Sequence, residues 1–229
     1  MFDVKQICMI YDMEKEEKLY ALKGFDLQLP DRGLIGIIGP SGSGKSTLMY
    51  CLSTLKAPTE GSILYNGREL TECTNAEREE LRRREFGFVF QKHYLVPYMG
   101  AVDNVMVAAY EKDKNARKKA EEILTRLGIR EREFSKKPAK LSGGQCQRVA
   151  IARAVINDPK VIFADEPTAS LDHENAFQVM KILKEYSGKR LVLVITHDKS
   201  ILKDCDRIIE MWDGGIGEGA SEILQGERG

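Results

Sequence analysis

A glycine-rich segment combines small residues, a lysine and two hydroxyl side chains in a fixed order. Its residues are Gly39, Pro40, Ser41, Gly42, Ser43, Gly44, Lys45, Ser46 and Thr47, which fit the pattern Gly-x-x-x-x-Gly-Lys-Ser. Glycines permit a tight turn whose backbone N–H groups converge on a phosphate, and the helix after the turn adds its positive dipole end. Lys45 is predicted to reach the β and γ oxygens, Ser46 to bind Mg²⁺ and Thr47 to bond the α-phosphate. The segment predicts a nucleoside triphosphate site.

Two adjacent carboxylates supply the second part of such a site. Asp165 and Glu166 follow the apolar run 161–164, which is predicted to be a strand. Ligands of open α/β sheets bind at the carboxyl ends of strands, where these acids lie. Asp165 is predicted to hold Mg²⁺ and Glu166 to orient and polarise the attacking water, since an ordinary glutamate is ionised near neutral pH. A pair of solvated acids is the alternative interpretation, and the neighbouring phosphate loop disfavours it.

Strands and helices must position these groups. The apolar run 34–38 directly precedes the glycine-rich loop, as expected for a parallel strand buried on both faces, and a helix is predicted from Lys45 to about Leu55. Alternation of apolar and polar residues over 4–10 and 20–29 predicts antiparallel strands. Later strands are predicted over residues 63–65, 161–164, 190–195 and 207–211, and helices over residues 116–127, 174–186 and 199–203.

The middle of the chain has a different pattern. Residues 92–158 are mostly helical in periodicity, and no strand-like run interrupts them. We therefore predict one α/β domain in which residues 1–91 and 159–229 form the core with an N-terminal antiparallel β-subdomain. Residues 92–158 are predicted to form an inserted helical subdomain.

Composition narrows the classes of partner. Lys plus Arg and Asp plus Glu both number 35 in 229 residues, so no excess positive charge favours nucleic acid as a partner. The longest apolar runs are strand-length, far short of the ~20 residues that span a bilayer, and no leader pattern opens the sequence. The five cysteines are scattered without a Cys-x-x-Cys pair, so we expect reduced thiols in a cytosolic protein.

The most specific segment consists of Leu141, Ser142, Gly143, Gly144 and Gln145. Ser142 can cap a helix running to about Asn157, Gln145 can complete a capping box, and the glycines leave N–H groups open to an anion. The pentapeptide resembles the signature of the ATP-binding cassette (ABC) family. That resemblance implies a RecA-like P-loop NTPase core that hydrolyses ATP with Mg²⁺. It also implies an ATP-dependent head-to-tail homodimer, since the family's signature closes over the γ-phosphate held by the second subunit.

Single residues fall where this resemblance requires them. Gln91, at the end of the run 86–90, resembles the Q-loop glutamine that senses Mg²⁺ and the water, and Asp172 resembles a D-loop residue at the dimer contact. His197 resembles the switch histidine that contacts the γ-phosphate. The implied catalytic set is Lys45, Gln91, Glu166 and His197, and the implied Mg²⁺ set is Ser46, Gln91 and Asp165.

Some positions allow two interpretations. Tyr11 resembles the aromatic residue that stacks on adenine, but Tyr20 and Phe25 are nearby competitors and an early tyrosine is also a common core residue. Cys146 stands where the family usually carries a polar residue. A thiol near a helix N-terminus can be reactive, whereas an inert side chain packed between helices is the favoured interpretation.

The segment 80–105 resembles one branch of the family. This branch serves macrolide exporters, lipoprotein release, antimicrobial-peptide resistance and the cell-division ABC complex, so a transmembrane permease is the implied partner and the cytosolic face of the plasma membrane the implied location. Tyr94, Leu95, Pro97 and Tyr98 are predicted to form the docking surface for the permease. The alternative is that these side chains fill the core of the helical subdomain.

Several functions fit such a motor. A transport ATPase would power efflux or extraction of an amphiphile, whereas a non-transport ATPase of the cell-division type would activate extracellular hydrolases. A soluble ABC ATPase of DNA repair or translation would need a long coiled-coil insertion or a second cassette, and the sequence has neither. A small-molecule kinase would have no use for residues 141–145.

Overall fold

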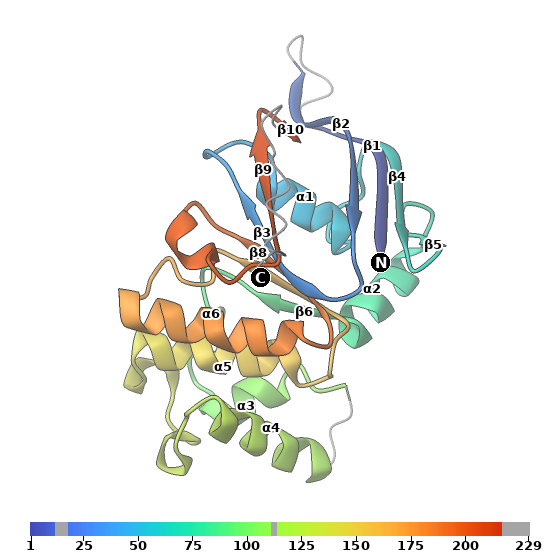
Figure 1. The fold of residues 1–229 in the computed structure, drawn as a ribbon. Coiled ribbons are helices and arrows are strands. Elements are labelled where there is room, and N and C mark those ends of the chain that lie inside the picture. The colour runs from blue at the N-terminus through green and yellow to red at the C-terminus, as the bar shows by residue number, and fades with distance from the viewer. Residues whose placement is uncertain (12–17, 111–113, 217–229) are drawn as a thin grey trace.

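The structure, a computed structural model, describes residues 1–11, 18–110 and 114–216 (Figure 1). The strands are β1 (Phe2–Tyr11), β2 (Leu19–Leu29), β3 (Gly33–Ile38), β4 (Glu60–Tyr65), β5 (Arg68–Glu69), β6 (Phe86–Val89), β7 (Val161–Asp165), β8 (Leu191–Ile195), β9 (Arg207–Trp212) and β10 (Gly215–Ile216). The α-helices are α1 (Lys45–Leu52), α2 (Asn75–Arg84), α3 (Ala101–Met106), α4 (Lys114–Arg126), α5 (Gly143–Val155) and α6 (His173–Ser187). Short 3₁₀ helices are η1 (Glu131–Glu133), η2 (Pro138–Lys140) and η3 (Lys199–Leu202).

A largely parallel sheet forms the centre of the molecule, with strand order β10-β9-β3-β8-β7-β6. Its inner strands read as near-continuous runs of branched apolar residues, and their side chains are buried on both faces, as parallel sheets require. In the parallel register, Ile195 of β8 lies opposite both Ile37 of β3 and Asp165 of β7. The carboxyl ends of these three strands therefore meet at one edge of the sheet.

An antiparallel sheet covers one side of this centre, with strand order β2-β1-β4-β5. Helix α1 lies between the two sheets (Figure 1). Its apolar residues Leu48 and Met49 share one buried cluster with Val4 of β1, Ile37 of β3 and Phe163 of β7. The first helix after the glycine-rich loop is thus held from both sides, which fixes the loop in front of it.

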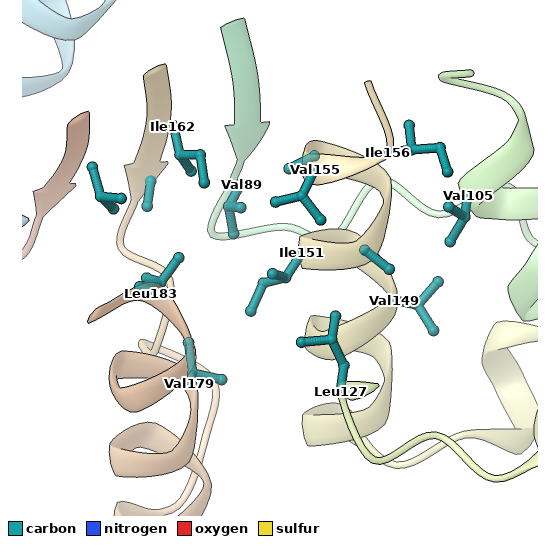
Figure 2. Close-up of a cluster of buried hydrophobic side chains, with 14 of the residues drawn as sticks. Val89, Val105, Leu127, Val149, Ile151, Val155, Ile156, Ile162, Val179 and Leu183 are labelled. Atoms are coloured by element: carbon teal, nitrogen blue, oxygen red, sulfur yellow. The ribbon is translucent and has the colours of Figure 1, made fainter. Parts of the chain in front are cut away.

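Helices cover the other face of the central sheet. Helix α5 packs between the sheet and helices α3 and α4, and Figure 2 shows its Ile151 and Val155 directed towards Val89 of β6 and Ile162 of β7. Helix α6 lies beside α5 on the same face (Figure 1). These side chains belong to one cluster in which nearly all apolar residues are buried, and burying each contributes about 1.5–3 kcal/mol.

The structure differs from the sequence predictions at several ends. Helix α1 stops at Leu52 instead of about Leu55, because Thr54 adopts a left-handed backbone with φ 60°. Residues 199–202 form a 3₁₀ turn rather than an α-helix. Strand β6 ends at Val89, so Gln91 lies beyond the strand rather than at its end.

Helix α2 is an element that the sequence analysis did not predict. Its start carries a full capping box, in which Thr74 Oγ1 accepts from Glu77 N and Glu77 Oε2 accepts from Thr74 N. Leu81 is the single buried residue of this helix, so the sequence has no periodic apolar pattern that would predict it. The two-residue strands β5 and β10 were also missed, since each exists only by pairing with a longer neighbour.

No helix within residues 1–11, 18–110 and 114–216 is long and apolar enough to cross a membrane. All five cysteines are unpaired thiols, as the scattered spacing predicts.

A substitution at Gly87 tests how closely β6 packs against the end of α5. A Cβ at this position would stand 2.3 Å from the carbonyl oxygen of Ala154 at the end of α5 and 3.1 Å from Pro159 Cγ. We expect Gly87→Ala to lower the free energy of unfolding by about 1–3 kcal/mol, measured by urea titration. Gly188→Ala is the control, since its Cβ would meet nothing nearer than 3.7 Å and its backbone has φ −59°. Equal stability of the two variants would contradict this packing.

Candidate functional site

A cleft of about 530 Å³ opens at the carboxyl edge of β3, β7 and β8. Its lining consists of Tyr11, Leu19, Tyr20, Ala21, Ser41, Gly42, Gly44, Lys45, Ser46, Thr47, Asp165, Glu166, Ile195 and His197. Residues far apart in the sequence meet here because the parallel strands deliver their ends to the same place. Most of the predicted phosphate-site residues therefore line one cavity. Leu19, Ala21 and Ile195 also line it and were not predicted, because nothing but the pairing of their strands places them there.

The glycine-rich loop is shaped by close backbone contacts. Gly44 has φ 93° and directly precedes α1, and a Cβ there would stand 2.3 Å from the carbonyl oxygen of Ala21. Gly39 has φ 152°, and a Cβ there would stand 2.1 Å from the carbonyl oxygen of Met211. The loop is thus pressed against β2 on one side and β9 on the other, and glycine is needed at both positions.

Lys45 folds back over the loop that precedes it. Its Nζ donates to the carbonyl oxygens of Gly39 at 2.9 Å and Pro40 at 2.7 Å, and to Ser43 Oγ at 3.3 Å. Burial lowers the pKa of Lys45, while the charges of Glu166 and Asp165 oppose that shift. The ammonium group is therefore positioned inside the loop, next to the two carboxylates.

Asp165 and Ser46 form the second contact of the site. Ser46 Oγ lies 3.3 Å from Asp165 Oδ1, which joins the start of α1 to the end of β7. Burial raises the pKa of Asp165, the neighbouring Glu166 acts in the same direction, and the hydrogen bond from Ser46 opposes the shift. A cation beside Asp165 would favour its ionised form.

Glu166 is held by the strand next to its own. Its backbone N–H donates to the carbonyl oxygen of Ile195 at 2.8 Å, and its backbone has a left-handed φ of 47°. The side chain accepts a hydrogen bond from Thr196 Oγ1 at 3.3 Å and lies 2.8 Å from His197 Nδ1. Because a carboxylate only accepts, Nδ1 carries the proton in this contact. The carboxylate is thus fixed at the cleft by two groups that follow β8.

Tyr11 and Tyr20 both border the cleft, so the structure does not separate these two candidates for the adenine contact. Tyr11 contacts Lys56, whose Nζ lies 3.0 Å from the phenol oxygen and 4.5 Å from the ring centroid. Phe25, the third candidate, has a side chain outside the part of the chain that the structure describes. A basic group therefore already stands against Tyr11 at the rim of the cleft.

The pentapeptide 141–145 lies apart from this cleft. The capping box is confirmed, since Ser142 Oγ accepts from Gln145 N at 3.2 Å and Gln145 Oε1 accepts from Ser142 N at 2.9 Å. Ser142 and Gly143 are exposed, while Gly144 is buried against Asn175 of α6. None of the five residues lines the cleft of the same chain.

Cys146 is buried directly behind the capping box. Its thiol donates to the carbonyl oxygen of Pro138 at 3.6 Å, and burial raises its pKa. The side chain is therefore protonated near neutral pH, which supports the interpretation of an inert packed residue over a reactive thiolate.

Asp172 and Gln91 also lie outside the cleft lining, as do Gly39, Pro40 and the buried Ser43. Asp172 is the N-cap of α6, and its Oδ1 accepts from the backbone N–H of Asn175 at 2.9 Å. Gln91 is exposed in the segment that follows β6. The structure thus brings together the phosphate loop, the carboxylates and His197. The cleft lining does not include Gln91, predicted as a Mg²⁺ ligand of the same site, or Asp172, predicted at the dimer contact.

The segment after Gln91 is tied to the helices. Asn104 of α3 is buried, and its Oδ1 accepts from Val96 N at 2.6 Å while its Nδ2 donates to the carbonyl oxygens of Val96, Met99 and Gly100. Arg153 of α5 donates to the carbonyl oxygens of His93 and Tyr94, both at 2.6 Å. The segment is therefore ordered by side chains from two helices.

The predicted docking residues divide into two groups. Tyr94 and Tyr98 are 66% and 71% exposed, and Pro97 is exposed beside them. Leu95 instead is partly buried and packs against the cluster that contains Ile151 and Val155 of α5. Exposure is confirmed for three of these four side chains, whereas Leu95 follows the alternative interpretation.

Comparisons with known proteins agree with this geometry. A family model described as "ABC transporter" matches residues 22–169. The lipoprotein-releasing system ATP-binding protein LolD of Aquifex aeolicus is 44% identical over 199 residues, covering 85% of this chain and 88% of LolD. The macrolide export ATP-binding/permease protein MacB of Bdellovibrio bacteriovorus is 42% identical over 218 residues, covering 94% of this chain but only 33% of MacB. The chain thus spans about a third of the length of that fused relative.

Solved structures give the same fold. The cassette MJ0796, in a dimeric post-hydrolysis state bound to ADP and phosphate, superposes with a TM-score of 0.86. It is 38% identical, and the match covers 94% of this chain and 96% of that one. A second dimeric structure of MJ0796 matches equally well.

Lys45 provides the test of the cleft. We expect Lys45→Ala to abolish ATP binding in isothermal titration calorimetry, because the substitution removes the ammonium that stands inside the phosphate loop. Lys181→Ala on the exposed face of α6 is the matched control and should bind as wild type. Unchanged affinity in Lys45→Ala would exclude this lysine from the phosphate site.

Proposed function

This chain belongs to the ABC transporter family and is one of its ATPase cassettes, and we propose that it hydrolyses MgATP between two copies of itself to drive a transmembrane permease. One observation carries the proposal. Lys45, Asp165, Glu166 and His197 line one cleft at the carboxyl edge of a parallel sheet, directly in front of the helix that follows a phosphate loop.

The triphosphate binds with its β- and γ-phosphates in the glycine-rich loop. Backbone N–H groups of the loop and the N-terminus of α1 stabilise the negative charge, and Lys45 turns from the carbonyl oxygens of Gly39 and Pro40 to the phosphate oxygens. Thr47 bonds the α-phosphate. Tyr11 at the rim stacks on adenine, and Tyr20 on the neighbouring strand is the alternative ring.

The residues present fit a magnesium ion. Mg²⁺ takes oxygen ligands and is usually held by one or two protein groups together with phosphates and water, and Ser46 Oγ and Asp165 Oδ1 already lie 3.3 Å apart. No cluster of three or more His, Cys, Asp or Glu side chains occurs among the described residues, and such a site needs none. Ser46 and Asp165, with Gln91 approaching from outside, would hold the ion, which would neutralise developing phosphate charge.

Hydrolysis depends on Glu166. Its carboxylate accepts a hydrogen bond from the attacking water and polarises it, while Thr196 and His197 hold the carboxylate in place. His197 is 72% exposed at its side chain, so it can turn from Glu166 to the γ-phosphate. The chain's own groups thus fix the carboxylate that activates the water and supply a side chain for the γ-phosphate.

The second subunit completes the site. Ser142 and Gly143 are exposed at the N-terminus of α5 and lie apart from their own cleft, which suits a contact with the γ-phosphate held by the other copy. Leu141 to Gln145 of each chain therefore close over the partner's ATP in a head-to-tail homodimer, with Asp172 at the contact. ATP stabilises this dimer because it binds both chains at once, and hydrolysis loosens it. The dimeric state of MJ0796 supports this arrangement.

We place permease coupling on the helical side. Residues 92–158 act as a helical subdomain between the α/β parts 1–91 and 159–229, and Gln91 links the two. Tyr94, Pro97 and Tyr98 form the docking surface for the permease. The cassette then lies on the cytosolic face of the membrane, attached through that partner. The names of LolD and MacB, which concern lipoprotein release and macrolide export, support an amphiphilic cargo.

Glu166→Gln separates binding from turnover. We expect this variant to bind ATP with unchanged affinity but to lose hydrolysis by a factor of at least ~10², because an amide cannot polarise the water. ATP should then hold it as a dimer, which light scattering detects. Hydrolysis at the wild-type rate, or a variant that stays monomeric with ATP, would contradict the proposed role.

Ser142→Arg tests the shared site. The larger cation blocks the start of α5, so we expect ATP binding to one subunit to persist in calorimetry while ATP-driven dimerisation and hydrolysis disappear. Loss of the cap itself costs about 1 kcal/mol, which a melting curve monitors. Thr125→Arg on the exposed face of α4 is the control and should hydrolyse normally. A fully active Ser142→Arg protein would argue for a site complete within one chain.

A further inference from the structure

A buried carboxylate stands behind the exposed start of α5. Glu133 belongs to the 3₁₀ helix η1 and is only 6% exposed. Its Oε1 accepts a hydrogen bond from Gln145 Nε2 at 2.8 Å, and its Oε2 accepts from the backbone N–H of Arg130 at 3.0 Å. Lys136 Nζ lies 3.8 Å from the same carboxylate. Glu133 is thus fixed by groups from its own turn and contacts α5 through Gln145.

This contact determines which way the Gln145 amide points. An amide can present either its oxygen or its NH₂ group to a neighbour, but an ionised carboxylate only accepts hydrogen bonds. The NH₂ group of Gln145 must therefore face Glu133. Its Oε1 then faces Ser142 and accepts a hydrogen bond from the backbone N–H of that residue, with an N–O distance of 2.9 Å. With the amide turned over, an NH₂ group would oppose that N–H and the capping box would be lost.

The carboxylate stays ionised under working conditions. The hydrogen bond from the backbone N–H of Arg130 lowers the pKa of Glu133, burial opposes this shift, and the amide of Gln145 and the charge of Lys136 add to the lowering. Near neutral pH, Glu133 is consequently a permanent acceptor. It contacts the capping box through the side chain of Gln145, whereas Ser142 and Gly143 are exposed.

A second neighbour packs against the same turn. Asn175 of α6 fills the space next to Gly144, since a Cβ there would stand 2.7 Å from Asn175 Oδ1. Asn175 is itself held by Asp172, whose Oδ2 accepts from Asn175 Nδ2 at 2.7 Å. The start of α5 therefore has two neighbours. Asn175 packs against Gly144, and the negative charge of Glu133 orients the amide of Gln145.

We propose that Glu133 is a positioning residue for the pentapeptide 141–145. By fixing the Gln145 amide, it keeps the capping box closed and holds the first N–H groups of α5 in the arrangement that receives the partner's γ-phosphate. Glu133 itself does not touch the nucleotide. This inference rests on the proposed function, because it concerns the contact made across the dimer.

The first test uses Glu133→Gln in the Glu166→Gln background, where ATP-bound dimers accumulate. An amide at position 133 can donate as well as accept, so it no longer dictates the orientation of Gln145. We expect the ATP concentration for half-maximal dimerisation, followed by light scattering, to rise about tenfold, as for the loss of one hydrogen bond. ATP binding to the monomer in calorimetry should not change. Glu131→Gln, on the exposed side of the same turn, is the matched control.

The second test exchanges the two groups. Gln145→Glu alone sets two carboxylates against each other and should weaken dimerisation. In the double variant Glu133→Gln/Gln145→Glu, the new amide donates to the new carboxylate and still accepts from Arg130 N, while the carboxylate accepts from Ser142 N. We expect the double variant to dimerise at a lower ATP concentration than either single variant. A role in folding alone would not produce this rescue at equal melting temperatures.

The outcomes separate the inference from the proposed function. If Glu133→Gln dimerises like its parent, or if the double variant is no better than the worse single variant, Glu133 does not position the pentapeptide. If the Glu166→Gln parent binds ATP but never dimerises, the shared site fails, and the inference fails with it. A rise confined to the Glu133 and Gln145 single variants, relieved in the double variant, supports the inference.

Discussion

The parallel register of β3, β8 and β7 is the constraint on which the site depends. Ile195 pairs with Ile37 on one side and with Asp165 on the other, so the chain leaves all three strands at the same level. More than a hundred residues of sequence separate the phosphate loop from the carboxylate pair and from His197, yet the sheet makes all three neighbours. The long apolar side chains in these strands are therefore as necessary to the cleft as the polar groups that line it.

Local backbone conformations and helix caps then fix the positions of the groups that the sheet brings together. Glycines at positions 39 and 44 allow the loop to press against two strands, and the left-handed backbone of Glu166 turns its carboxylate towards the residues after β8. Such a conformation is costly for a residue with a Cβ and persists only where surrounding contacts impose it. Here the hydrogen bond from Glu166 N to Ile195 O imposes it. Helix caps built on Ser142 and Asp172 fix two turns that do not line the cleft.

Sequence patterns predicted what depends on short-range chemistry. The apolar runs of β3, β7 and β8, the glycine-rich loop and the capping box of Ser142 and Gln145 all follow from neighbouring residues, and the structure agrees with them. Helix α2 was missed because its single buried residue gives no periodic signal, although Thr74 and Glu77 carried the capping pattern. The choice between Tyr11 and Tyr20 stayed open since both border the cleft.

Contacts between distant segments were beyond such patterns. Nothing in the local sequence links Glu133 to Gln145 or Asn175 to Gly144, because each pair is created by the way η1, α5 and α6 pack. The same reason explains why the sequence left Leu95 open between a docking surface and the core, whereas the structure packs it against a buried cluster. Packing partners are set by the whole fold, and a sequence read segment by segment does not contain them.

The segment after Gln91 is attached by hydrogen bonds to two helices. The side chains of Asn104 in α3 and Arg153 in α5 donate hydrogen bonds to its carbonyl groups, and both residues belong to helices rather than to the sheet. A force on Tyr94 or Tyr98 would therefore act on α3 and α5 together, because the hydrogen bonds of this segment run to those two helices. The exposed rings of this segment are thus mechanically coupled to the helices that cover the sheet, through Arg153 of α5 and Asn104 of α3.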